Sequence, residues 1–265
     1  MNFWDHLDIL RSVILKILAV TLVFSLIAFV FKDTLFTIVL APKNADFITY
    51  QWLNLVGDLL PGGEMANFNV ALINTGLAEQ FIIHMKTAFC AGILCASPYI
   101  LYQMFRFVSP ALYENEKSYA VKSIGWGYLM FLIGVGVSYY LVFPLTFRFL
   151  GTYQVSHEVA NMISLQSYMS TLILMSLAMG IVFEMPVLAW LFAKMGFIST
   201  TYLRKYRKHA IVIILIAAAI ITPTSDVFTL IVVSLPMYLL YELSITIVKR
   251  VSKNNAADEN LCAEA

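Results

Sequence analysis

Three acidic residues are the strongest candidates of this sequence for functional chemistry. Glu184 lies within the apolar stretch GIVFEMPVLAW, whereas Glu114 and Glu116 lie in the more polar stretch FRFVSPALYENEK. An ionisable group inside an apolar segment costs free energy unless it meets protein or water, so Glu184 is by default a functional candidate. The alternative for Glu184 is a protonated carboxyl that bonds a neighbouring helix. For Glu114 and Glu116 the alternative is an ordinary solvated loop.

The patterns of covalent catalysis and metal binding are absent. The chain contains no G-x-S-x-G, H-E-x-x-H, G-x-x-x-x-G-K-[ST] or C-x-x-C, and its four histidines are scattered. The sequence therefore predicts a protein that is not an enzyme and that needs neither a metal nor a cofactor.

Composition indicates where these residues must sit. Of 265 residues, 60% are hydrophobic and only 12% are charged, about half the charged share of a soluble domain. The net charge of +1 gives no sign of a nucleic-acid partner. The chain is predicted to be a membrane protein.

Six apolar stretches predict the fold class, an all-α polytopic membrane protein with six transmembrane helices. A full span needs about 20 apolar residues. The fifth stretch supplies only about 14 residues, or roughly 21 Å of helix, and Pro236 interrupts the sixth, so the last two spans are expected to be short. Residues 1–250 are predicted to form one domain, and 251–265 a disordered cytoplasmic tail. The stretches are 12–31, 81–104, 123–144, 168–193, 209–222 and 227–248.

Basic residues predict the orientation of these spans. With the amino terminus inside, only Lys32, Lys43 and Arg148 fall in outer segments, whereas most other lysines and arginines fall on the cytoplasmic side. Six spans then place both termini in the cytoplasm.

Several further polar residues lie at the ends of the spans. In HLDILR, Asp8 and Arg11 are three residues apart and share one helical face at the membrane surface, which also fits an ordinary interfacial pair. Lys86 lies about five residues inside the second span, where an anchoring role is at least as plausible as a functional one. Asp226 is expected to cap the last span.

Taken in order, these segments resemble the TatC family, the multispanning core of the Sec-independent twin-arginine protein translocase. The resemblance runs from His6 to about Glu242. It rests on HLDILR, the APK stretch with Pro42, HMKTAF, SPYILYQMFRFVSPALYENEK, FLIGVGVSYYLVFP, GIVFEMPV, ITPTSDVF and LPMYLLYE.

The resemblance implies a receptor in the bacterial cytoplasmic (inner) membrane for folded proteins that carry twin-arginine signal peptides. It implies single-span partners of the TatA/TatB type, a homo-oligomer within the receptor complex, and export driven by the proton-motive force. Glu116 occupies the family's cytoplasmic acid position, and a carboxylate there suits the planar donor fork of a guanidinium.

A second acid of the family pattern H-L-x-E-L-R is missing, because Ile9 stands at that position. Asp8 is one residue away, a rotation of about 100° around a helix, and Asp5 lies one turn earlier on nearly the same face. Either acid is a candidate replacement, and Glu114 is a third.

The family also places a Glu at the position of Glu184, where partner helices meet a polar-lined face, and it matches Lys86, Pro42 and Asp226. A competing hypothesis is a proton-coupled small-molecule carrier that uses Glu184 as its protonation site. Carriers usually show repeated halves, and this sequence shows no repeat to the eye.

Overall fold

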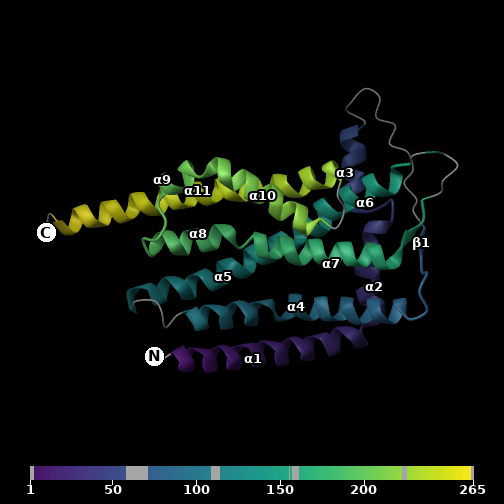
Figure 1. The fold of residues 1–265 in the computed structure, drawn as a ribbon, viewed down its shortest axis with the longest axis horizontal. Helices are drawn as coiled ribbons and strands as arrows, with labels where there is room; N and C mark the ends of the chain where they lie inside the picture. Colours follow the sequence, from purple (N-terminus) through teal and green to yellow (C-terminus); the bar gives the residue numbers. More distant parts are fainter. Residues whose placement is uncertain are drawn as a thin grey trace. The chain divides into compact units, whose positions relative to one another are not determined.

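Almost the whole described chain is helical in the computed structural model (Figure 1). The structure describes the backbone of residues 3–57, 71–108, 114–154, 156, 161–222 and 226–263, and side chains in 7–55, 71–104, 106–107, 124–154, 156, 161–222 and 226–252. The helices are α1 (Phe3–Val30), α2 (Lys32–Leu40), the 3-10 turn η1 (Ala41–Lys43), α3 (Ile48–Gly57), α4 (Glu79–Val108), α5 (Glu114–Val137), the π-helical turn η3 (Ser138–Val142), α6 (Phe143–Thr152), α7 (Leu165–Val182), α8 (Met185–Lys194), α9 (Thr200–Lys205), α10 (Arg207–Ile221) and α11 (Val227–Ala263).

Five helical segments of the described chain are long and apolar enough to cross a membrane, which confirms the all-α polytopic fold class. The remaining predicted span, 209–222, corresponds to α10, whose 15 residues give roughly 22 Å of helix. That length is short of a full span, so the count of six stays a prediction. The prediction that the last span is also short is wrong, because Val227–Ser252 has 26 residues and α11 continues through Pro236. The five segments are Leu7–Val30, Glu79–Met104, Ile124–Thr152, Leu165–Lys194 and Val227–Ser252.

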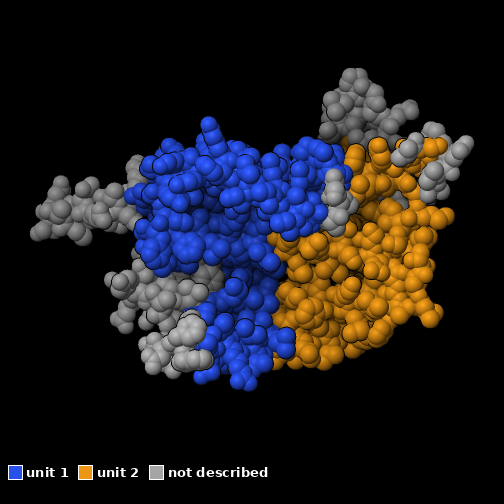
Figure 2. Space-filling view, in the orientation of Figure 1, with its two compact units in different colours: residues 1–18, 97–134, 180–265 blue, residues 19–96, 135–179 orange. Residues whose placement is uncertain are grey.

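The chain divides into two compact units (Figure 2). Unit 1 comprises residues 1–18, 97–134 and 180–265, and unit 2 comprises 19–96 and 135–179. The helices α1, α4, α5 and α7 each contribute residues to both units. The single domain predicted for 1–250 and the disordered tail predicted for 251–265 stay predictions, and α11 includes 251–263.

Unit 1 is organised around α11, which packs on α8 and α10 (Figure 1). A buried cluster of Ala193, Val248 and Val251 joins α8 to α11. Trp190 and Leu203 pack against this cluster. Burial of these apolar side chains stabilises the packing of α8 on α11.

A left-handed glycine ends α8. Gly196 has φ +75°, a conformation that glycine adopts without steric cost. Its N–H donates to the Ala193 carbonyl at 3.1 Å, and the Phe197 N–H donates to the Phe192 carbonyl at 2.9 Å, which is the Schellman pattern. Ser199 then caps α9 by accepting from the Tyr202 N–H at 3.3 Å.

Unit 2 has an aromatic core and a small parallel sheet. Phe143, Phe147 and Tyr168 are almost fully buried, and each phenylalanine ring packs edge-on against Tyr168 with centroids 5.0 Å apart. Strand β1 (Leu72–Ile73) pairs with β2 (Ile163–Ser164) in parallel. This pairing ties together two segments that are far apart in the sequence.

Candidate functional site

Glu184 lies where the fourth span is interrupted. The helix α7 ends at Val182 and α8 begins at Met185, so Glu184 sits in the junction. Pro186 follows, and because its nitrogen carries no hydrogen, the regular helical bonding pattern cannot continue through this point. At the break, the Glu184 N–H donates to the Ile181 carbonyl, three residues earlier, at 3.1 Å. Regular helical bonding resumes where the Glu184 carbonyl accepts from the Leu188 N–H at 3.0 Å. The sequence thus builds a local break and places an acid within it.

The carboxylate of Glu184 is buried within unit 1 and has an oxygen without a hydrogen bond. The residue is 9% exposed, and in the described part of the chain its Oε1 has no hydrogen-bond partner. A buried polar atom without a partner costs about 1–3 kcal/mol, and more when it is charged. This unsatisfied oxygen makes Glu184 a functional candidate.

The neighbour of this carboxylate is the backbone of α5 at Gly127. A Cβ built on Gly127 would lie 2.9 Å from Glu184 Oε2 and 3.4 Å from Oε1. The sequence interpretation did not identify Gly127, because nothing in the local pattern of α5 indicates which residue of α5 faces Glu184.

The predicted signal-binding acids lie at the beginnings of helices. Glu114 is the first residue of α5, and Glu116 lies in its first turn. The amino terminus of a helix favours negative charge, so these positions suit acidic residues. The side chains of Glu114, Glu116 and Asp5 lie outside the described ones. Their distances to other groups are therefore not part of the geometry established for this site.

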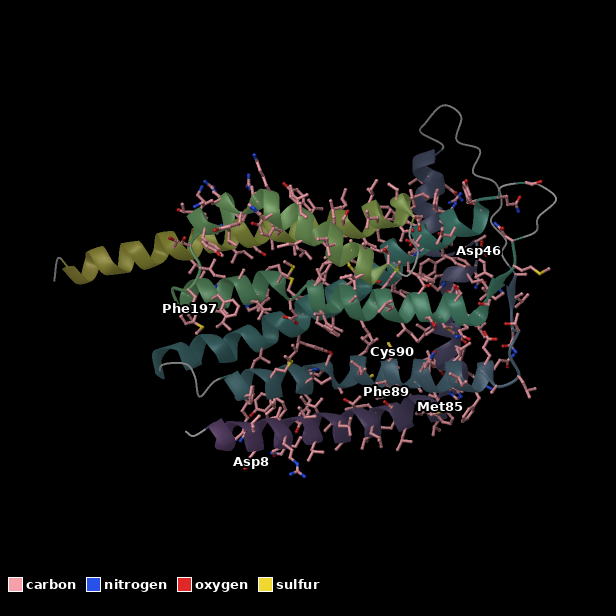
Figure 3. The ribbon with its side chains drawn as sticks, viewed as in Figure 1. Asp8, Asp46, Met85, Phe89, Cys90 and Phe197 are labelled. Atoms are coloured by element: carbon pink, nitrogen blue, oxygen red, sulfur yellow. The ribbon has the colours of Figure 1, made fainter. Side chains whose placement is uncertain are left out.

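Asp8 and Arg11 are exposed on the first turns of α1 (Figure 3). In the described part of the chain these two side chains do not form the interfacial ion pair that their spacing allows. Asp8 is therefore accessible to a cationic ligand.

Lys86 is exposed on α4, one residue after the exposed Met85 (Figure 3). Both belong to unit 2, whereas Glu184 belongs to unit 1. The structure thus assigns the two predicted intramembrane polar residues to different units.

Pro42 is held by a tyrosine hydroxyl within unit 2. Pro42 is fully buried in η1, and its carbonyl accepts a hydrogen bond from the Tyr50 hydroxyl at 2.9 Å. The same hydroxyl lies 3.2 Å from the carbonyl of Pro144 in α6. The Tyr50 hydroxyl thereby joins α3, which carries it, to η1 and α6. Pro42, which is predicted to lie on the outer side, is thus held within unit 2.

Two more tyrosines bond the end of α2. The Tyr168 hydroxyl donates to the Val39 carbonyl at 3.0 Å, and the Tyr139 hydroxyl donates to the Ile38 carbonyl at 2.5 Å. The Ile38 carbonyl also accepts from the Ala41 N–H, so the tyrosine hydroxyls add to the backbone bonding at this helix end. We call Tyr50, Tyr139 and Tyr168 the tyrosine clamp.

Tyr50 remains a donor under ordinary conditions. Burial raises the pKa of its phenol, and the positive charge of Arg148 offsets part of that rise. The Arg148 guanidinium carbon lies 5.8 Å from the centre of the Tyr50 ring.

Asp226 caps α11, as the sequence predicts. Its Oδ2 accepts a hydrogen bond from the Thr229 N–H at 2.6 Å. This contact fixes where the last predicted span begins and gives Asp226 a structural role.

Glu79 is a buried acid that the sequence interpretation missed. It is 7% exposed, and its Oε2 accepts from the Gly76 N–H at 2.7 Å and from the Thr75 N–H at 3.1 Å. Its Oε1 accepts from the Gln166 N–H at 3.1 Å, which joins the start of α4 to the start of α7. The available sequence signal is an acid three residues after Gly76 and just before an apolar run, as in a capping box.

Comparisons with known proteins agree with this architecture. Residues 5–236 match the family model described as Sec-independent protein translocase protein (TatC). The chain is 33% identical over 258 residues to the Sec-independent protein translocase protein TatC of Blattabacterium sp. subsp. Periplaneta americana, covering 96% of this chain and 97% of that protein. The Helicobacter pylori (strain ATCC 700392 / 26695) protein of the same name is 41% identical over 194 residues, covering 73% and 76%.

A solved structure shows the same fold. The crystal structure described as twin arginine translocase receptor TatC superimposes with a TM-score of 0.74 at 33% identity, covering 93% of this chain and 99% of that one. These relatives are components of a protein translocase rather than enzymes, and they favour protein transport over a small-molecule carrier. The chain belongs to the TatC family of Sec-independent protein translocase proteins.

Proposed function

We propose that this chain is the receptor and core subunit of a twin-arginine translocase. It binds twin-arginine signal peptides at the cytoplasmic face, assembles with single-span partners of the TatA/TatB type and with further copies of itself, and exports folded proteins using the proton-motive force. The observation that carries the proposal is the family match over residues 5–236, supported by the likeness to a solved TatC described as a receptor.

The proposed topology has six spans in the bacterial inner membrane, with α10 as a short fifth span and both termini inside. The basic residues support this orientation, because Arg204, Lys205 and Lys208 cluster around α9 and α10. A 15-residue span requires local thinning of the bilayer or shielding by other protein.

Glu116 is proposed to bind an arginine of the signal peptide. Glu116 lies in the first turn of α5, and a guanidinium can donate to both oxygens of a carboxylate. Asp8, Asp5 or Glu114 is proposed to bind the second arginine, and Arg11 flanks this region of α1. Of the two acids in α1, Asp8 has the described side chain, and it is exposed.

Glu184 is proposed to be the intramembrane contact for a partner helix. Its buried Oε1, which lacks a partner in the described chain, supports this role because an incoming polar group could satisfy it. Lys86 is proposed as a secondary polar contact, and Pro42 and Asp226 as structural residues of the periplasmic side.

The test is capture of a twin-arginine signal peptide by the full-length protein in membranes. Glu116→Gln should weaken capture about tenfold to a hundredfold, because hydrogen bonds to charged groups contribute about 1.5–3 kcal/mol. Asp8→Asn, Asp5→Asn and Glu114→Gln, made singly, identify the second acid by which of them also weakens capture. Asp46→Asn is the matched control, since Asp46 is an exposed acid on the predicted outer side (Figure 3).

A peptide with two lysines in place of the arginine pair completes the experiment. It should bind more weakly than the arginine peptide to the unaltered chain, because an ammonium lacks the bidentate donor fork. Unchanged capture by Glu116→Gln, or equal capture of the two peptides, would show that the assignment is wrong.

A further inference from the structure

The glycine opposite Glu184 has a consequence for where the buried carboxylate points. Gly127 and Glu184 both belong to unit 1. The Cβ that any other residue would bring to position 127 would lie 2.9 Å from Oε2, 3.4 Å from Oε1 and 3.6 Å from Cδ. Only the distance to Oε2 is shorter than real Cβ atoms show, and the other two are ordinary contacts, so it is the place of Oε2 that depends on the missing side chain.

The atoms that a Cβ would meet are the flexible end of Glu184 rather than backbone. A methyl group at position 127 would therefore displace the Glu184 carboxylate and leave α5 in place. This movement should lower the affinity for a partner, because a hydrogen bond formed by a buried acid depends on the position of its oxygens.

We propose that Gly127 is a positioning residue for Glu184: the missing side chain leaves room for Oε2 against the backbone of α5 and so sets where the carboxylate lies for its contact with the polar group of a partner helix. The inference rests on the proposed partner contact at Glu184. It adds that the recess at Gly127, and not Glu184 alone, sets the geometry of that contact.

A second glycine supplies a matched control. Gly125 lies two residues earlier on the same helix, and a Cβ built there meets nothing within 4 Å. Gly127→Ala and Gly125→Ala therefore make the same change in helix propensity, and only the first reaches the carboxylate.

Two measurements on the full-length protein in membranes test the inference. The first is modification of Glu184 by a hydrophobic carbodiimide, quantified by mass spectrometry, which reports on the placement of the carboxyl whether or not a partner binds. The second is cross-linking of a TatA/TatB-type single-span protein to this site. Gly127→Ala should change the modification rate severalfold and lower partner affinity about tenfold, the effect of losing one hydrogen bond to a buried acid.

A compensating change makes the test specific. Glu184→Asp withdraws the carboxylate by one methylene, so Gly127→Ala should have little further effect when it is combined with Glu184→Asp. Equal modification rates in Gly127→Ala and Gly125→Ala, or a full effect of Gly127→Ala on top of Glu184→Asp, would overturn the inference. If modification responds as expected but partner binding ignores both Gly127→Ala and Glu184→Gln, positioning by Gly127 is upheld and the partner contact proposed for Glu184 is wrong.

Discussion

Two buried glutamates differ in how fully their carboxylates are satisfied. Glu79 accepts hydrogen bonds on both oxygens, from Gly76, Thr75 and Gln166, whereas Glu184 has a buried oxygen for which the described chain supplies no donor. A satisfied buried acid stabilises the fold, and an unsatisfied one costs free energy that function must justify. The hydrogen bonds that each carboxylate accepts therefore distinguish the structural acid, Glu79, from the functional candidate, Glu184.

Removing one hydroxyl of the tyrosine clamp should likewise leave a buried acceptor without a hydrogen bond and lower the stability. Tyr50→Phe keeps the ring but leaves the buried Pro42 carbonyl without its donor. We expect the free energy of unfolding to fall by about 1–3 kcal/mol, which thermal unfolding in detergent would detect as a lower Tm.

Tyr140→Phe is the control for this change. The ring of Tyr140 stacks on Phe47, which also contacts the ring of Tyr50, but Tyr140 is 52% exposed. Its substitution should leave the Tm nearly unchanged. Equal effects of Tyr50→Phe and Tyr140→Phe would contradict the structural role given to the clamp.

At the scale of elements, the crossing of α1 and α4 is set by one glycine. A Cβ on Gly92 would lie 2.1 Å from Ser25 Oγ, 2.7 Å from Ser25 N and 2.9 Å from Ser25 Cα. Only 11% of the most apolar window of α1 is buried, against 39–44% in the other four spans, so α1 has few other contacts to hold it. Close approach of backbones at small residues is how membrane helices associate.

Gly92→Ala should therefore destabilise the protein by about 1–3 kcal/mol, the usual cost of overpacking. Gly136→Ala is the matched control, because a Cβ on Gly136 in α5 meets nothing within 4 Å. Thermal unfolding in detergent would compare the two. Ser25→Ala should not rescue Gly92→Ala, since the backbone atoms of Ser25 still clash, and a full rescue would show that the helices are not in direct backbone contact.

Helices, but not their contacts, were predictable from the sequence. Long apolar runs alone predict four of the five long spans, and Pro186 marks the break beside Glu184. The pairing of Leu72 with Ile163 was not predictable, because each strand has two residues and no alternation to read. Gly92 and Gly127 were missed for the same reason: a helix sequence alone does not indicate what its small residues face.

At the scale of the whole molecule, composition and charge predicted an all-α membrane protein. The family match added that the chain belongs to the TatC family. The residues matched by the family model include Glu116, Glu184 and Asp226, so the proposed sites all lie inside the recognised region. Glu116 and Ile9 were interpretable only through the resemblance, since an acid or its absence at a helix end carries no function by itself. Charge bias could predict sidedness, whereas length could not decide whether the 15-residue α10 crosses the membrane.

The crossing by α10 decides where the carboxyl terminus lies. If α10 crosses the membrane, the chain has six spans and both termini are cytoplasmic, whereas five spans would put the termini on opposite sides. The native Cys262 is a reporter for the carboxyl terminus once Cys90→Ala and Cys95→Ala remove the other two cysteines. In a chain that also carries Cys262→Ala, Asn2→Cys reports on the amino terminus, and Asn44→Cys, in a separate chain, reports on the predicted outer side.

A membrane-impermeant maleimide applied to intact inner-membrane spheroplasts should label only the Asn44→Cys chain. Cys262 and the Asn2→Cys chain should react only after the membrane is permeabilised, because the basic residues near both termini hold those segments inside. Labelling of Cys262 in intact spheroplasts, with the Asn2→Cys chain still protected, would mean that α10 does not cross. The cluster of Arg204, Lys205 and Lys208 would then still lie inside, and the segment from Pro223 onward would have to be reassigned.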